Sequence, residues 1–325
     1  MEDSTAKPVR VASSAIAASR DGSPSVQRLT QPRFATGPDR LALWAAGVTV
    51  VLWASAFVAI RGAGREFSPG ALALGRLACG TVVLGLVAWR RREPWPQRAA
   101  WPGIAVSGFL WFGVYMVALN WGEQKVDAGT AAIVVGLGPV IVALLSGWLL
   151  KEGFPRNLMA GLAVSIAGVV VVGVATSRIG HASTAGVLLC LAAAVSFGTA
   201  VVIQKKALGH ASSVQVITFG AAVGTLACLA FAGQLVSEVA TAPLSSTLSA
   251  CYLGVFPTAI GFSTWGYALA RTPAAKMGAT TYLVPALTVL MSWAILGQVS
   301  SWLSIAGGSL CLAGVALSRR QPNSP

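Results

Sequence analysis

Residues 137–169 of this chain, LGPVIVALLSGWLLKEGFPRNLMAGLAVSIAGV, align without a gap with residues 283–315, LVPALTVLMSWAILGQVSSWLSIAGGSLCLAGV. Ten positions are identical to the residue 146 positions further on, namely Leu137, Pro139, Leu144, Ser146, Leu150, Ala160, Gly161, Ala167, Gly168 and Val169. A shared bias towards Ala, Gly, Leu and Val explains some identities, but it does not explain the matched prolines, Pro139 and Pro285. The chain therefore carries an internal repeat.

The composition around this repeat is that of a membrane protein. Hydrophobic residues make up 55% of the chain and charged residues 10%, against roughly 25% charged in soluble domains. Charges and turn residues divide the chain into apolar segments, each near the roughly 20 residues that cross about 30 Å of hydrocarbon as a helix. Ten segments are predicted, over 41–60, 69–89, 101–121, 128–150, 157–176, 184–204, 213–233, 247–269, 277–296 and 300–318. We therefore expect an all-α integral membrane protein with ten transmembrane helices.

The distribution of Lys and Arg predicts the orientation. With the N-terminus inside, 18 of the 23 basic residues lie in cytoplasmic segments, and Arg61, Arg65, Lys125 and Arg178 lie in outside loops. We therefore expect a multi-pass protein of the cell inner (plasma) membrane with both termini cytoplasmic. Five helices per repeat is an odd number, so the two halves must enter the membrane from opposite sides. Such inverted repeats are typical of secondary transporters, with the substrate near mid-membrane between the halves.

Other function classes lack their sequence signatures. The net charge of +13 is spread over short clusters between apolar runs, which disfavours a nucleic-acid surface. The five cysteines are scattered without a CxxC motif, so neither a zinc site nor disulfides are expected. The HExxH and GxSxG motifs of intramembrane proteases are missing. We expect no catalytic residues, no metal, no cofactor and no nucleic-acid partner.

Several short stretches recur in the order of a known family. They are residues 52–57 (LWASAF), 75–77 (GRL), 129–132 (GTAA), 137–139 (LGP), 150–152 (LKE), 279–285 (ATTYLVP) and the glycines Gly307 and Gly314. With the duplication, they resemble the EamA type of the drug/metabolite transporter superfamily. The resemblance implies a central cavity surrounded by eight helices, a peripheral fifth and tenth helix, and transport of amino acids or similar metabolites. The expected domains are a disordered tail (1–40), two five-helix repeats (41–178 and 182–318) and a C-terminal tail (319–325).

The acidic residues bear on energy coupling. Glu152 follows the family pattern, but its counterpart in the second repeat is Gln298, which weakens any role for a symmetric carboxylate pair. All ten acidic residues fall in the tail, loops or helix ends of the predicted topology, as do His181 and His210. Proton-coupled carriers often keep such a group inside the membrane. Facilitated diffusion or exchange is therefore expected, rather than coupling through a buried carboxylate.

Arg76 is the one charge placed well inside a predicted helix, about seven residues or roughly 10 Å from its outer end. It can neutralise a substrate carboxylate, bind a helix carbonyl, or extend to the membrane interface. Three prolines are candidates for kinks or gates: Pro139 and Pro285 at matching repeat positions, and Pro257. A proline frees a backbone carbonyl one turn earlier, which can bend the helix or meet a ligand.

Neutral polar and aromatic side chains within the spans complete the candidate binding site, because a cavity for a zwitterion needs donors, acceptors and ring faces. They are Trp53, Ser55, Tyr115, Asn120, Thr199, Gln204, Thr264, Trp265, Tyr267, Thr280, Thr281 and Tyr282. Individually, most are also explained by hydrogen bonds between helices or by anchoring at the interface.

The predicted function is a secondary transporter that exports small metabolites such as amino acids by alternating access. Its partners are a small-molecule solute and the lipid bilayer, and it acts as a monomer or homodimer. Two alternatives stay open. A membrane scaffold or receptor needs neither a duplicated half nor a polar cavity. A carrier of phosphate esters or nucleotide sugars needs several inward-facing basic residues.

Overall fold

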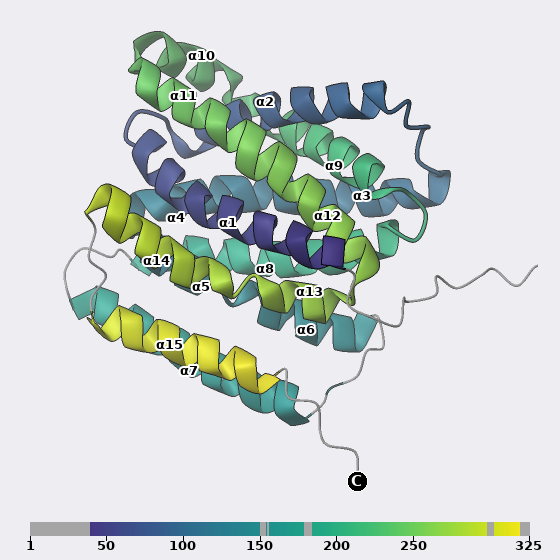
Figure 1. Ribbon diagram of the computed structural model, residues 1–325. Helices are drawn as coiled ribbons and strands as arrows, with labels where there is room; N and C mark the ends of the chain where they lie inside the picture. The colour runs from purple at the N-terminus through teal and green to yellow at the C-terminus, as the bar shows by residue number, and fades with distance from the viewer. Residues whose placement is uncertain (1–39, 150–153, 155, 179–183, 298–301, 319–325) are drawn as a thin grey trace, which may run out of the picture. The chain divides into compact units, whose positions relative to one another are not determined.

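A computed structural model describes residues 40–149, 154, 156–178, 184–297 and 302–318, and the secondary structure within these residues is helical throughout. Residues 1–39 and 319–325 of the predicted tails lie outside the described residues, as do Glu152 and Gln298. The helices in chain order (Figure 1) are α1 (Arg40–Ala63), α2 (Pro69–Arg90), η1 (Arg98–Ala100), α3 (Trp101–Gly108), η2 (Phe109–Tyr115), α4 (Met116–Lys125), α5 (Ala128–Val135), α6 (Gly138–Leu149), α7 (Arg156–Arg178), α8 (Thr184–Ala207), α9 (Ser213–Ala227), η3 (Cys228–Phe231), α10 (Ala232–Thr241), α11 (Leu244–Leu253), η4 (Gly254–Ile260), α12 (Gly261–Arg271), α13 (Ala274–Thr280), α14 (Leu283–Leu296) and α15 (Trp302–Ser318).

Within the described residues, seven helical runs are long and apolar enough to cross a membrane. They are Arg40–Ala63, Pro69–Arg90, Arg98–Lys125, Ala128–Leu149, Thr184–Ala207, Ser213–Thr241 and Ala274–Leu296. Shorter apolar stretches lie in α7 (Met159–Gly168) and α15 (Ile305–Gly314). Large apolar side chains are exposed on the surface, including Trp44, Trp89, Trp148 and Trp302 near helix ends. Such a surface suits lipid, and tryptophans at helix ends are typical of the membrane interface. The chain is a multi-pass membrane protein.

Several helices are longer than the sequence indicated. The predicted segment 101–121 continues to Lys125, and the predicted segment 213–233 continues through α10 to Thr241. The charge-free stretch after Met277 is divided as expected, because α14 ends at Leu296 and Gly297 follows with a left-handed backbone (φ 62°). A glycine adopts this conformation at a helix end without steric cost.

Local side chains fix two helix starts. The Asp127 carboxylate accepts hydrogen bonds from the backbone N–H of Thr130 (2.9 Å) and from its hydroxyl (2.6 Å), which caps α5. At α9, Ser212 and Gln215 bind each other's backbone N–H in a reciprocal capping box. Both arrangements satisfy amide groups that the first helical turn leaves without a partner.

The helices α7 and α15 pack mainly on each other and reach the remaining helices chiefly through α5. Figure 1 shows the pair side by side at one edge of the bundle. Their close approach depends on the repeated glycines: a Cβ on Gly314 would lie 2.5 Å from the carbonyl oxygen of Gly161. Small residues at such crossings let the backbones meet, because helix association in lipid relies on van der Waals packing.

The interior of the remaining bundle is filled by aromatic rings around α1. The Trp53 ring lies 5.8 Å from that of Trp111 and 5.0 Å from that of Trp265. Phe197 of α8 and Phe262 of α12 pack on the same tryptophans. We call these five rings the aromatic cluster. Trp111 and Trp265 are almost fully buried, so the cluster is packed core, with favourable edge-to-face geometry.

The helix α2 packs closely against the π-helix η4. A Cβ on Gly80 would lie 2.8 Å from Thr258 Cγ2 and 2.9 Å from the Gly254 carbonyl oxygen. The neighbouring Gly85 has open space around the same position.

We therefore predict that Gly80→Leu destabilises the protein by about 1–3 kcal/mol or more through overpacking, whereas Gly85→Leu has little effect. Thermal unfolding in detergent measures both. Equal melting temperatures for the two variants would contradict this account of the α2–η4 contact.

Candidate functional site

Two helices are interrupted just before the prolines Pro139 and Pro285, which are related by the 146-residue shift. One interruption separates α5, which ends at Val135, from α6, which begins at Gly138. The other separates α13, which ends at Thr280, from α14, which begins at Leu283. Pro139 and Pro285 follow the interruptions, so neither supplies the amide that a continuous helix would donate to the carbonyl of Val135 or Thr281. Interrupted helices inside a membrane protein are tolerated where they are buried or line a cavity.

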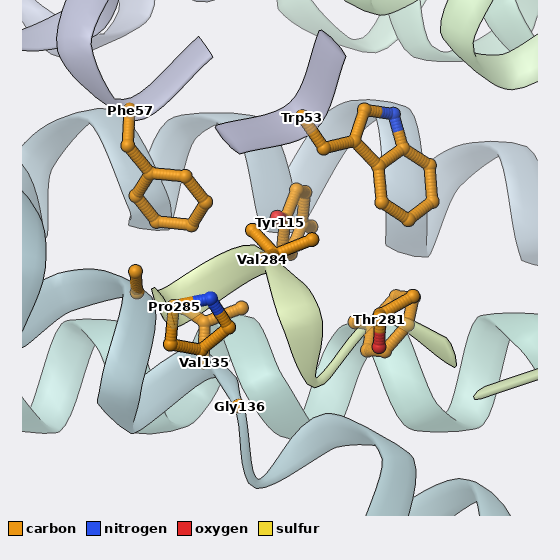
Figure 2. Close-up of a pocket in the computed structure, with 10 residues that line it drawn as sticks. Trp53, Phe57, Tyr115, Val135, Gly136, Thr281, Val284 and Pro285 are labelled. Carbon is orange, nitrogen blue, oxygen red and sulfur yellow. The ribbon is translucent and has the colours of Figure 1, made fainter. Parts of the chain in front are cut away.

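The two interruptions face a common space, which we call the central cavity. It is lined by Trp53, Phe57, Tyr115, Ala132, Val135, Gly136, Phe197, Thr281, Val284 and Pro285. Figure 2 shows the α1 side chains Trp53 and Phe57 on one side and Thr281, Val284 and Pro285 on the opposite side. Its volume is about 30 Å³, which is room for one or two water molecules.

A second space, the arginine pocket, lies beside the first and shares Trp53, Phe57 and Tyr115 with it. Its lining comprises Trp53, Ala56, Phe57, Arg76, Trp111, Tyr115, Met116, Leu119 and Phe262. Its volume is about 20 Å³. Among the residues that line the two spaces, Arg76 alone carries a charge. Three side chains, Trp53, Phe57 and Tyr115, thus form the wall between an apolar cavity and a buried cation.

Arg76 is 3% exposed, so it does not extend to the membrane interface. Its Nε and Nη2 donate to Thr258 Oγ1 at 3.4 and 3.3 Å, and its Nη1 is buried with no hydrogen-bond partner in the described structure. The Thr258 hydroxyl in turn donates to the Leu253 carbonyl at 2.8 Å. This is the carbonyl four residues before Pro257, which cannot supply the usual helical amide. Because Pro257 lacks this amide, the Thr258 hydroxyl binds the free carbonyl and holds Arg76 in place. Nη1 of Arg76 takes no part in this contact.

Hydrogen bonds tie the helices together at both ends of the bundle. At one end, Arg61 Nη1 binds the backbone carbonyls of Glu123 and Val126, and Gln124 Nε2 binds those of Gly64 and Phe67. At the other end, Lys205 Nζ binds the carbonyls of Leu269 and Thr272 at 2.6 and 2.8 Å. The helices of the bundle are thus tied by side chains at both ends.

The other residues singled out from the sequence lie outside the lining of these two spaces. Gln204 Oε1 accepts from Trp265 Nε1 (3.1 Å), Ser55 pairs with the Tyr252 hydroxyl (2.7 Å), and Thr264 pairs with Thr49 (2.8 Å).

Thr199 and Thr280 bond to carbonyls of their own helices. The Arg271 guanidinium lies 3.6 Å above the ring of Tyr267, and Tyr282 packs against Val140. Asn120 is buried and donates to the Pro69 carbonyl (3.1 Å).

The sequence reasoning missed Glu123. We placed the end of its helix at residue 121, which put the carboxylate in a loop, but α4 continues to Lys125 and leaves Glu123 only 1% exposed. The missed signal is the polar run of residues 120–125 (NWGEQK), which is typical of a helix end, although its side chains bind the carbonyl of Pro69 in α2 and that of Gly64 just after α1. No group of three or more His, Cys, Asp or Glu side chains suited to a metal is present in the part of the chain that the structure describes.

The chain matches the model of the EamA-like transporter family twice, over residues 40–174 and 184–320. A probable terminal-alkyne amino-acid exporter of Streptantibioticus cattleyicolor is 38% identical over 280 residues, which cover 86% of this chain and 94% of that protein. The uncharacterized transporter YdfC of Bacillus subtilis is 33% identical, covering 84% of this chain and 89% of that protein.

A probable amino-acid metabolite efflux pump of Salmonella typhimurium is 26% identical, with coverage of 66% and 73%. A solved crystal structure superposes with a TM-score of 0.63 at 21% identity, covering 86% of this chain and 96% of that one, which supports the fold. Because the family model covers both halves and close relatives span nearly their whole length, the chain belongs to the EamA-like transporter family of the drug/metabolite transporter superfamily.

Proposed function

We propose that this protein exports amino acids or similar zwitterionic metabolites across the cytoplasmic membrane by alternating access, with the solute bound in the central cavity. The observation that carries the proposal is the meeting of two interrupted helices, each broken just before a proline of the repeated pair, beside the buried Arg76. Interrupted helices commonly form the substrate site of secondary transporters. The available Nη1 of Arg76 suits the carboxylate of a solute.

The arrangement of the halves follows from the same proposal. Ten spans, as two inverted five-helix repeats over 41–178 and 182–318, bring the two interruptions together beside the cavity, where a Cβ on Gly136 would lie 3.4 Å from Pro285 Cγ. With both termini cytoplasmic, the end of the bundle that holds Lys205 faces the cytoplasm and the end that holds Arg61 faces outward. The excess of Lys and Arg on the former side supports this orientation.

The small size of the cavity supports alternating access. A space of about 30 Å³ is too small for an amino acid, and the helices around it are tied at both ends. The conformation therefore corresponds to an occluded state. Loading requires release of the Lys205 bonds to Leu269 and Thr272, and discharge requires release of the Arg61 bonds to Glu123 and Val126.

The solute class is supported by two relatives whose names specify amino-acid export. A phosphate ester or nucleotide sugar would need several cations to balance its charge, and Arg76 is the one charged residue among those that line the two spaces. The aromatic faces of Trp53 and Tyr115 add apolar contact for the hydrocarbon part of the solute.

Counterflow in proteoliposomes tests the proposal. Purified protein is reconstituted at equal pH on both sides with a panel of labelled amino acids. Saturable exchange that depends on the protein is expected. Folded protein that exchanges none of the panel, with an imposed pH gradient also tried, would overturn the amino-acid assignment.

Arg76→Met is predicted to raise KM for amino acids roughly 10- to 100-fold, because a hydrogen bond to a charged group contributes about 1.5–3 kcal/mol. Amino-acid amides, which lack the carboxylate, should be affected much less. The exposed Arg65, changed to Met, is the matched control. An equal rise in KM for amino acids and for their amides would show that Arg76 acts only on the fold.

Pro139→Ala and Pro285→Ala are predicted to lower the maximal exchange rate several-fold. The new amides can donate to the carbonyls of Val135 and Thr281 and extend the helices across the interruptions. Counterflow at saturating solute measures the rate, and Pro243→Ala at the exposed start of α11 is the control. Unchanged exchange rates in both variants would show that the interruptions play no part in the transport cycle.

Thiol labelling tests the orientation. In a variant without native cysteines, a cysteine at position 65 should react in intact cells with a membrane-impermeant reagent. A cysteine at position 210 should react only after permeabilisation, because His210 lies at the predicted cytoplasmic end. The reverse pattern would invert the proposed topology.

A further inference from the structure

Glu123 is a buried carboxylate in the last turn of α4. It is 1% exposed, and both of its carboxylate oxygens lack a hydrogen-bond partner in the described structure. An ionised carboxylate buried without a partner is costly, and inside a membrane protein such a group marks a functional site.

The groups around Glu123 come from four other helical segments. Charged groups close enough to act on it are Arg61 of α1, Arg76 of α2 and Asp127 at the start of α5. Tyr115 precedes it along the same continuous run of η2 and α4, and Cys190 of α8 packs against the neighbouring Gly122. Arg61 uses its Nη1 on the backbone carbonyls of Glu123 and Val126. Asp127 is engaged in the cap of α5.

Buried donor and acceptor atoms without a hydrogen-bond partner thus lie in the same part of the interior. Arg76 offers an unpartnered donor, Nη1, and Glu123 offers two unpartnered acceptors. A third acceptor is Asn120 Oδ1, whose orientation is fixed because Nδ2 donates to the Pro69 carbonyl. Asn120 lies three residues before Glu123, and Leu119, which lines the arginine pocket, lies four residues before it. Residues at these spacings share a helix face.

The leftover atoms match the two ends of a zwitterion. A carboxylate accepts from Arg76, and an ammonium group carries three donors, which three acceptors on Glu123 and Asn120 can take. We propose, on the basis of the proposed function, that Glu123 binds the ammonium group of the solute. When no solute is bound, Glu123 holds a proton instead. Solute and proton therefore compete for Glu123 and are exchanged in opposite directions across the membrane.

Coupling follows from this competition. A proton bound to Glu123 removes the buried negative charge in the closed, empty protein. A solute ammonium group binds the ionised carboxylate, so the proton leaves to water as the solute enters. If the protein changes between its inward- and outward-facing states only when Glu123 holds a proton or the solute, an inward proton gradient drives outward movement of the solute. This revises the sequence-based expectation of transport without a buried carboxylate.

The first experiment needs no knowledge of the transported solute. Infrared pH-difference spectra of the purified protein in lipid should contain the carbonyl band of a buried carboxylic acid. The band should be present in wild type and in Glu66→Gln, and absent in Glu123→Gln. Glu66 is the matched control because it is exposed in the segment between α1 and α2, near the same end of the bundle. A band that persists in Glu123→Gln, or that is missing in wild type, overturns the proposal.

The second experiment measures protons released on binding in weakly buffered solution with a pH dye. A mixture of protein amino acids should release protons from wild type and Glu66→Gln but not from Glu123→Gln. The same mixture after N-acetylation, which removes the ammonium group, should release none from wild type, and this comparison needs no variant to fold. Amino acids that bind wild type without releasing protons would overturn the competition.

The two proposals fail separately. Absence of counterflow in wild type refutes the amino-acid function but leaves the infrared titration of Glu123 intact. Normal counterflow together with an unchanged pH-driven accumulation in Glu123→Gln refutes the exchange site and leaves the transporter.

Discussion

A peptide group in the hydrocarbon core has no water to bind, so its N–H and C=O must be satisfied inside the protein. This constraint produces the long apolar helices of the chain and restricts where they can be interrupted. The two interruptions, after Val135 and after Thr280, both lie in the interior, against the central cavity. Each is followed by a proline that cannot donate to the preceding turn. The helices can therefore be interrupted at these two places because both lie inside the protein, against the cavity.

The same constraint explains how a guanidinium is accommodated inside the bundle. Pro257 removes an amide from η4, and the Thr258 hydroxyl donates to the carbonyl that this leaves free. The Thr258 oxygen then accepts from Arg76. Glycines at 80 and 254 allow α2 and η4 to approach closely enough for this contact. A kink that reads as a packing feature in the sequence thus serves to position a charge.

Arg76 and Glu123 illustrate the difference between a structural ion pair and a site. In the interior, opposite charges usually bond to each other, because an unpartnered charge is costly. Here the free nitrogen of the one and the oxygens of the other have no partner in the described residues. Rings of the aromatic cluster line the pocket of Arg76. In the proposed site, these atoms bind the two charges of one zwitterionic solute.

Much of the fold was predictable from hydropathy and repeat alone, because both depend on residue type at fixed periods. Seven of the predicted segments correspond to helical runs long and apolar enough to cross a membrane, and the division at Gly297 agrees with the structure. Helix ends were less accurate, since Gln124 falls in a loop of the predicted topology although it lies in α4 and bonds to the Phe67 carbonyl. Ser55 and Tyr267 could not be sorted from Trp53 and Tyr115 in the sequence, because a polar residue in a span has the same signature whether it faces a helix or a cavity.

The sequence by itself determined that the chain is helical, membrane-embedded, internally repeated and similar to a transporter family. These properties follow from composition, spacing and charge, which require no knowledge of contacts. Only the tertiary structure decided that Arg76 is buried with a free nitrogen and that Glu123 lies inside the protein. It also decided that the two interrupted helices face one cavity. Burial and hydrogen-bond partners depend on which segments pack together. The hydrogen bonds between these segments join residues that lie 60 to more than 200 positions apart in the chain.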